Sequence, residues 1–174
     1  MSVHAMKSRI ILIGCGKMGS AMLHGWLSDS GLDAEFLIVE PAQDHLSWTA
    51  SHDNVHLHGS VAGAAADGRA ATMVVLAVKP QMMDASIGSI GPLRDDKTAF
   101  LTIAAGISTS WLKCRLGSHP SVLRAMPNTP AAIGKGVTGD TGVGRCQSTN
   151  TQNHALDLPT QNMKLLVTGG CGFI

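Results

Sequence analysis

Short apolar runs rich in β-branched residues recur along this chain and constrain its fold more than any other feature. Each run is continuous rather than alternating, as in strands that are buried on both faces. Segments of helical spacing or of small residues separate the runs, so repeated strand–helix–strand units that build one parallel sheet explain the pattern. We therefore predict an α/β fold with strands at 9–13, 36–39, 55–57, 72–78, 98–103 and 121–126.

The spacing of apolar residues also predicts two helices. One begins directly after the first strand and ends at 29–31, and a second begins after Ser108, a residue type favoured at N-caps, and ends at Gly117. We expect Trp111 of the second helix in the core. The first helix places one apolar face toward the sheet, made of Met18, Ala21, Met22, Gly25 and Trp26.

A glycine-rich loop joins the first strand to the first helix. Its spacing is GxGxxG, which permits a tight turn, lets the backbone approach a pyrophosphate, allows close packing and points a helix N-terminus at the anion. The second strand ends at Glu40, 21 residues beyond Gly19, near the offset at which an acid contacts ribose hydroxyls. Together these features predict a Rossmann-like, doubly wound, mostly parallel sheet that binds a dinucleotide through Gly14, Gly16, Lys17, Met18, Gly19 and Glu40.

The acid at the end of the second strand also predicts which dinucleotide is preferred. A carboxylate at Glu40 would repel a 2′-phosphate, and no arginine follows in 41–44. We therefore expect NADH to be favoured over NADPH. The alternative interpretation is that Glu40 is only a solvated strand end.

Charge and hydropathy exclude several classes of partner. The chain has 13 basic and 12 acidic residues, so it lacks the positive surface that nucleic acids require. Its longest apolar stretch is 73–78, far short of the ~20 residues that cross a bilayer, and its start lacks the pattern of a secretory signal. We expect a cytoplasmic protein with no nucleic-acid or membrane partner.

The cysteines and histidines do not predict a metal site. Cys15, Cys114, Cys146 and Cys171 are widely separated, so no CxxC pair exists, and we expect all four as reduced thiols. The pair at His56 and His58 lacks a third ligand nearby in the sequence.

Two further segments follow predicted strands, where open α/β sheets bind their ligands. One contains LAVKPQ at 76–81, and the other contains RAMPNTPA at 124–131; IAAG at 103–106 follows the strand between them. Prolines restrict the backbone of both turns. In this order and spacing, the three segments resemble those of pyrroline-5-carboxylate reductases, over about residues 7–138.

The resemblance implies an oxidoreductase of proline biosynthesis, in which NAD(P)H transfers a hydride to the C=N bond of 1-pyrroline-5-carboxylate and gives L-proline. NADPH is the common cofactor of that family. The resemblance further implies that Lys79, Asn128 and Thr129 lie near the chemistry, and that Ala77, Val78, Lys79, Pro80, Ala105, Gly106 and Asn128 line the cofactor site. The alternative interpretations are that Lys79 is only a surface charge at a strand end, and that Asn128 and Thr129 are only residues that favour such a turn.

The resemblance ends after Thr138, where family members continue into a helical second domain that forms the homo-oligomer. We divide the chain into a dinucleotide-binding domain at 1–138 and an atypical tail at 139–174, expected to be disordered or loosely packed. The last twelve residues, 163–174, weakly resemble the start of a nucleotide-sugar epimerase or dehydratase. We expect a truncated or frame-altered reductase, in which the missing domain matters more for turnover than for cofactor binding.

Two alternative functions remain open at this point. One is a non-catalytic NAD(P)-binding module, which the missing domain favours. The other is a different dehydrogenase of the β-hydroxyacid or prephenate type, which would share the glycine loop but is not expected to combine VKPQ with MPNTP.

Overall fold

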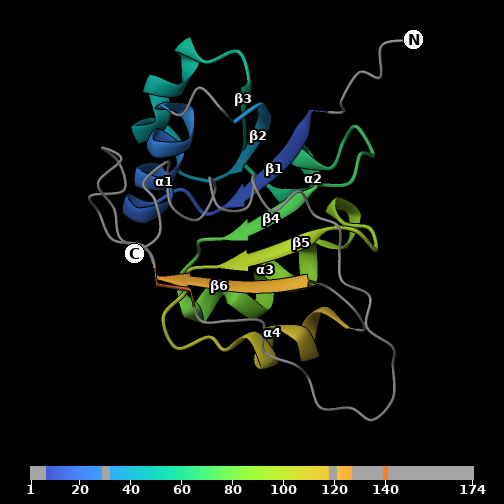
Figure 1. Ribbon diagram of the computed structural model, residues 1–174. Helices are drawn as coiled ribbons and strands as arrows, with labels where there is room; N and C mark the ends of the chain where they lie inside the picture. Colours follow the sequence, from blue (N-terminus) through green and yellow to red (C-terminus); the bar gives the residue numbers. More distant parts are fainter. Residues whose placement is uncertain (1–6, 29–31, 118–120, 127–138, 141–174) are drawn as a thin grey trace.

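A single mixed sheet organises the chain (Figure 1). The computed structural model describes residues 7–28, 32–117, 121–126 and 139–140. Within them the strand order is β3-β2-β1-β4-β5-β6-β7, with β1 to β6 parallel and β7 antiparallel to β6. The strands are β1 (Ser8–Ile13), β2 (Ala34–Val39), β3 (Val55–His58), β4 (Met73–Leu76), β5 (Ala99–Thr102), β6 (Ser121–Met126) and β7 (Gly139–Asp140).

The predicted fold class is confirmed by this topology. The chain runs outward from β1 through β2 to β3, then returns to place β4 on the other side of β1. This reversal is the mark of a doubly wound sheet. The fourth strand is shorter than predicted. The prediction is 72–78, whereas β4 ends at Leu76. The backbone leaves the sheet there to form the turn that holds Lys79 and Pro80.

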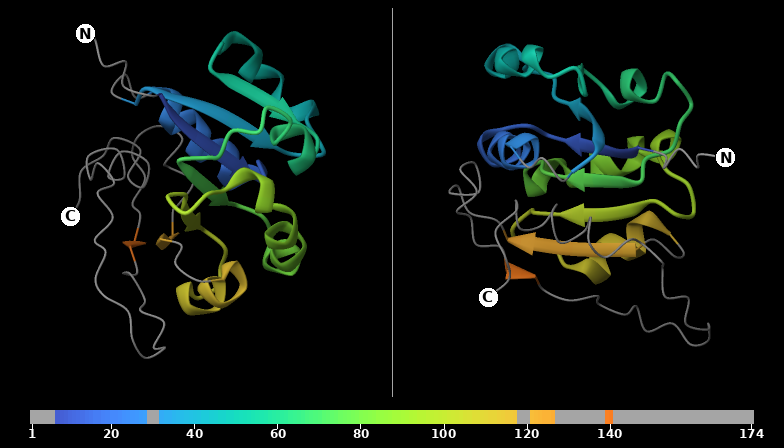
Figure 2. Two further views of the ribbon diagram at one scale, coloured as in Figure 1. Left: turned by 90° about the vertical axis from the view of Figure 1, so that its right-hand side faces the viewer. Right: turned by 45° about the horizontal axis from the view of Figure 1, so that its top comes forward.

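The helices cover both faces of the sheet. On one face, α1 (Lys17–Ser28) buries Trp26, Met22 and Leu23 against alternate residues of the central strands. On the other face lie α2 (Val61–Ala64), α3 (Met83–Ser89) and α4 (Thr109–Leu116), with the 3₁₀ helix η3 (Gly91–Leu93) (Figure 2). Two more 3₁₀ helices, η1 (Asp44–Ser51) and η2 (Pro80–Met82), follow β2 and β4. Burial on both faces explains why the strands are continuously apolar.

The second predicted helix is confirmed at both ends, as α4. The Ser108 hydroxyl accepts the Trp111 N–H at 3.1 Å, and Gly117 ends the helix with φ +82°. The expectation that Trp111 lies in the core is met only in part. This side chain packs against the core beneath α4 but is half-buried, and the Arg115 guanidinium lies 4.1 Å from its ring centroid. The helices α2 and α3 were not predicted, since a segment of four or seven residues is too short to show helical periodicity.

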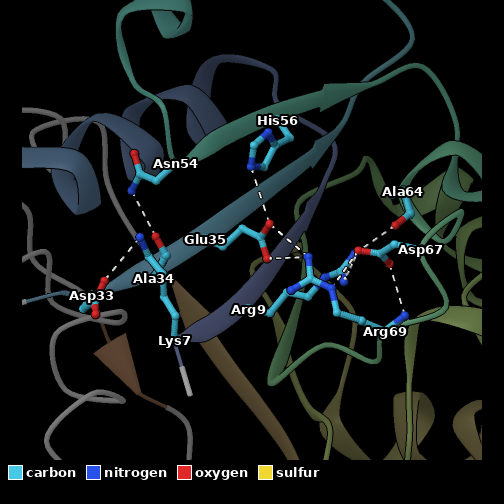
Figure 3. Close-up of polar contacts among 10 residues, drawn as sticks. All are labelled: Lys7, Arg9, Asp33, Ala34, Glu35, Asn54, His56, Ala64, Asp67 and Arg69. Atoms are coloured by element: carbon cyan, nitrogen blue, oxygen red, sulfur yellow. Dashed lines mark hydrogen bonds and ion pairs between the residues drawn. The ribbon is translucent and has the colours of Figure 1, made fainter. Parts of the chain in front are cut away.

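A buried arginine connects the amino ends of the strands (Figure 3). Arg9 of β1 is 4% exposed, and its guanidinium donates to Asp67 Oδ2 at 2.7 Å and to the Ala64 carbonyl at 3.1 Å. Arg69 extends the network from Asp67 to Glu35 of β2, at 2.8 and 3.0 Å. This network joins the loop after α2 to two strands at the sheet edge opposite the predicted cofactor edge, so we interpret it as structural.

Two further expectations concern membrane-spanning helices and the tail proposed to begin at residue 139. None of the helices in the described ranges is long and apolar enough to cross a membrane. β7 begins one residue after the proposed domain boundary and pairs with Met126 and Ala125 of β6. The remainder of the proposed tail, with its epimerase-like end, lies outside the described residues, so the domain division stays a prediction.

Candidate functional site

The predicted cofactor-binding segments share one edge of the sheet. Strands β1, β2, β4 and β5 are parallel neighbours, so the loops that follow them begin at the same edge. The sheet order reverses between β1 and β4, and ligands of open α/β sheets bind at such a switch point. The loop at 14–16 follows β1, Glu40 follows β2, the turn at 77–80 follows β4, and 105–106 follow β5.

The three glycines of the loop differ in what a side chain at each position would meet. Gly14 has φ +86°, and a Cβ there would lie 2.9 Å from both the Ala77 carbonyl oxygen and Val78 Cγ1. A Cβ on Gly19 would lie 2.7 Å from the Gly14 carbonyl oxygen. A Cβ on Gly16 would meet no atom within 4 Å. Packing within the chain therefore requires Gly14 and Gly19, whereas Gly16 faces open space that a ligand could use.

The glycine loop and the turn after β4 are in direct contact. The Ala77 N–H donates to the Ile13 carbonyl at 2.8 Å, and the Gly14 N–H donates to the Val39 carbonyl at 2.9 Å. Val78 packs over Gly14. Two motifs that are about 60 residues apart in the sequence thus form one structural unit at the switch point.

Glu40 is bound to the glycine loop. Its Oε2 accepts the Cys15 N–H at 2.8 Å, and its Oε1 accepts the Ala42 N–H at 3.1 Å. This geometry argues against the alternative of a freely solvated strand end. It places a carboxylate directly beside the loop that is expected to bind the cofactor.

The thiol in the middle of the loop is buried and protonated. Cys15 is fully buried, and burial raises the pKa of its thiol to about 11, with the Glu40 carboxylate adding to the rise and the Ser20 hydrogen bond opposing it. The thiol therefore stays protonated at neutral pH and is not a nucleophile. Cys15 and Cys114 are both free, as expected; Cys146 and Cys171 lie outside the described residues.

Sequence reasoning missed two side chains at the loop. The Ser20 hydroxyl and the His45 imidazole both contact the Cys15 carbonyl oxygen, at 3.0 and 2.7 Å. Ser20 follows the motif by one residue, a position that would have justified attention. His45 lies in η1, and nothing in its sequence context signalled a contact with the loop.

The structure describes only some of the other predicted site residues. Lys79 is exposed and precedes Pro80, the first residue of η2. Ala105 and Gly106 are exposed after β5, and Gly106 has φ +76°. Asn128 and Thr129 lie outside the described residues. Nowhere in 7–28, 32–117 and 121–126 do three or more histidine, cysteine or acidic side chains gather as metal ligands.

Comparison with known proteins identifies relatives of this arrangement. Residues 9–106 match the family model described as NADP oxidoreductase coenzyme F420-dependent. The pyrroline-5-carboxylate reductase of Haemophilus influenzae is 37% identical over 131 residues, which are 75% of this chain and 46% of that protein. The chain therefore spans about half the length of the curated relatives it matches.

Two solved structures share the fold. A pyrroline-5-carboxylate reductase from Coxiella burnetii aligns with TM-score 0.72 and 23% identity, over 95% of this chain and 57% of that one. The Plasmodium falciparum pyrroline carboxylate reductase with NADP bound aligns with TM-score 0.68 and 20% identity, over 94% and 55%. The resemblance predicted from the motifs is confirmed. Since the family model spans more than half of the sequence, this chain belongs to the coenzyme F420-dependent NADP oxidoreductase family, and pyrroline-5-carboxylate reductases are among its relatives.

Proposed function

We propose that this chain is the dinucleotide-binding part of a pyrroline-5-carboxylate reductase. The observation that carries the proposal is the contact between the glycine loop and the turn after β4, which joins Gly14 to Ala77 and Val78 at the switch point. The loop belongs to many dinucleotide-binding proteins, whereas the turn carries the VKPQ motif of the reductases. A site made of both therefore supports the specific assignment.

Each part of the proposed site has a distinct task. The first turn of an α-helix leaves its backbone N–H groups without acceptors inside the helix. Those of α1, which begins at Lys17, would hold the diphosphate together with Gly16. Glu40 would accept hydrogen bonds from a ribose. The bound dinucleotide supplies the hydride, and the protein supplies orientation and polarity. The complete set proposed to bind the cofactor is Gly14, Gly16, Lys17, Met18, Gly19, Glu40, Ala77, Val78, Lys79, Pro80, Ala105, Gly106 and Asn128.

The proposed substrate is 1-pyrroline-5-carboxylate, whose protonated C=N bond is already electrophilic. The reaction therefore needs positioned polar groups more than a strong acid, and Lys79, Asn128 and Thr129 are the proposed residues at the reacting ring. A cytoplasmic location and the homo-oligomer implied by the family remain predictions.

We also propose that NADH is preferred over NADPH. The Glu40 carboxylate already accepts the N–H groups of Cys15 and Ala42, so an incoming 2′-phosphate would meet a negative charge beside amides that are in use. The Plasmodium falciparum reductase binds NADP, so the proposed preference distinguishes this chain from that protein.

A second candidate function is dinucleotide binding without turnover. The matched segment makes up 46% of the Haemophilus influenzae enzyme, so turnover is a separate question from cofactor binding. Hydride transfer depends on near-attack geometry, and a displacement of about 1 Å can cost about a hundredfold in rate. Binding and turnover must therefore be measured separately.

The test compares Gly16→Ala with Gly88→Ala. A Cβ at either position meets no atom within 4 Å, so neither variant should disturb the fold. Calorimetric titration with NADH should show at least tenfold weaker binding for Gly16→Ala and unchanged binding for Gly88→Ala, because only Gly16 faces the proposed diphosphate. Oxidation of NADH on addition of pyrroline-5-carboxylate then separates the reductase from the binding module. Equal affinities of both variants and the wild type would contradict the proposed site.

A further inference from the structure

One carbonyl oxygen in the glycine loop accepts hydrogen bonds from two side chains. The Ser20 hydroxyl of α1 donates to the Cys15 carbonyl at 3.0 Å. His45 Nε2 lies 2.7 Å from the same oxygen. A carbonyl carries no proton, so in this contact the imidazole is the donor and its Nε2 bears the hydrogen. Donors from two separate elements thus converge on a single acceptor.

These contacts fix the orientation of the peptide that links Cys15 to Gly16. In a trans peptide the C=O and N–H bonds point in opposite directions, and no cis peptide is found among the described residues. Holding the Cys15 oxygen toward Ser20 and His45 therefore directs the Gly16 N–H away from them. Gly16 is also the loop glycine that faces open space.

The neighbouring groups make this orientation rigid. Ser20 contacts both sides of Gly16, since its backbone N–H donates to the Gly16 carbonyl at 2.8 Å while its hydroxyl binds the preceding carbonyl. His45 is held by its neighbour Leu46, which is fully buried and donates its N–H to the Gln43 carbonyl at 2.8 Å. Glu40 fixes the peptide before Cys15 through the Cys15 N–H.

We propose that Ser20 and His45 are positioning residues for the dinucleotide: they hold the Cys15 carbonyl so that the Gly16 N–H is presented to the diphosphate. They also neutralise an oxygen whose partial negative charge would otherwise weaken binding of an anion. This inference rests on the proposed function, because it assumes that a dinucleotide occupies the glycine loop. Neither residue needs to touch the cofactor.

The experiment uses the full chain and removes each donor separately and together. The variants are Ser20→Ala, His45→Ala and the double variant, and Ser20→Thr and His45→Gln each restore a donor. Ser28→Ala is the matched control on α1, because the Ser28 hydroxyl also donates to a backbone carbonyl, that of His24, at 2.8 Å and away from the loop. The dissociation constants for NADH, ADP and adenosine are measured by calorimetry or NMR titration, together with the melting temperature of each variant.

Each single variant should raise the dissociation constant for NADH about two- to tenfold, the range of one net hydrogen bond. The double variant should lose more than the product of the singles, because one remaining donor still holds the carbonyl. The donor-restoring variants should recover binding, and Ser28→Ala should not change it. Affinity for ADP should fall with that for NADH, whereas affinity for adenosine should not, because adenosine has no diphosphate.

Three results would overturn the inference: unchanged binding by the double variant, equal losses for adenosine and ADP, or no recovery with Ser20→Thr and His45→Gln. If the double variant does not fold, the wild-type chain still gives an answer. Addition of ADP, but not of adenosine, should then produce a large shift of the Gly16 amide signal, and its absence would overturn the inference. Failure of the wild-type chain to bind NADH, NADPH and ADP contradicts the proposed function, and the inference with it.

Discussion

The ion pair between Arg9 and Asp67 offers a direct test of how this fold is held together. The Arg9 side chain is 5% exposed and donates to Asp67 Oδ2 at 2.7 Å, while Asp67 remains 41% exposed. In Asp67→Asn the charge that balances a buried guanidinium is removed, and the Ala64 carbonyl is its other described acceptor. No partner is found for Arg9 Nε, so the guanidinium has no reserve contact in the described part of the chain.

The expected cost follows from the burial of the two partners. Removing one member of a buried pair costs about 3–5 kcal/mol, because the other charge stays buried without a partner. Solvent already screens the exposed side of Asp67, and asparagine keeps an acceptor oxygen, so the expected loss of unfolding free energy is about 2 kcal/mol. Glu35→Gln is the matched control. It removes the charge that faces Arg69, which is 59% exposed, and His56, but keeps an acceptor oxygen, so it should cost less than about 1 kcal/mol.

Urea denaturation followed by tryptophan fluorescence measures these differences, since Trp26 is buried against Phe36. Arg9→Met should cost less than Asp67→Asn, because it removes the buried charge itself and leaves Asp67 bound to Arg69. The reasoning is refuted if Asp67→Asn unfolds at the same urea concentration as the wild type. It is also refuted if Glu35→Gln costs as much as Asp67→Asn.

The same pair predicts how stability depends on pH. The hydrogen bond from Arg9, with those from Arg69, holds the pKa of the Asp67 carboxyl well below its usual range. Because the folded pKa lies below the unfolded one, the contribution of Asp67 is complete above about pH 5 and is lost as the pH falls through the unfolded value near 4 toward the folded one. The difference between the wild type and Asp67→Asn should therefore be constant from pH 7 to about 5 and shrink in more acidic solution. A difference that grows on acidification would contradict this assignment.

Three further predictions concern the cofactor edge. Iodoacetamide at neutral pH should label the exposed Cys114 and leave Cys15 unmodified in the folded chain, because burial raises the pKa of the Cys15 thiol to about 11. Peptide mapping by mass spectrometry measures the labelling of each cysteine. Rapid labelling of Cys15 would contradict the prediction. Gly14→Ala should cost at least about 2 kcal/mol in urea denaturation, because it combines φ +86° with a contact 2.9 Å from the Ala77 oxygen; a neutral effect would show that the loop adapts. Glu40→Gln keeps an acceptor for the loop amide but removes the charge, so the affinity for NADPH relative to NADH should rise about tenfold in competitive titrations, and an unchanged ratio would refute the charge argument.

Local sequence patterns predicted the elements that their own residues specify. Continuous apolar runs marked the strands because both faces of the sheet are covered, and Ser108 and Gly117 marked the ends of α4 through its capping geometry. The glycine motif predicted the loop because two of its glycines are required by packing that any side chain would prevent. The end of β4 was predicted too late, since Ala77 and Val78 are as apolar as the strand that precedes them.

The contacts that sequence patterns did not predict are those between distant segments. Arg9 and Asp67 are 58 residues apart, and His45 is 30 residues from Cys15. Neither pair has a spacing that periodicity can reveal, because a folded loop and not a helix or strand brings them together. From the sequence alone, charged and imidazole side chains whose partners are distant in the chain are predicted to be surface residues.

The contact of Gly14 with the turn after β4 has a consequence for how the chain acquires its loop. The six letters of the motif lie in the first twenty residues, but Ala77 and Val78, which close over Gly14, are synthesised some sixty residues later. A fragment that ends before β4 therefore contains the whole glycine signature without the neighbour that packs against it. In the growing polypeptide, the mature shape of the loop must wait until β4 has paired with β1.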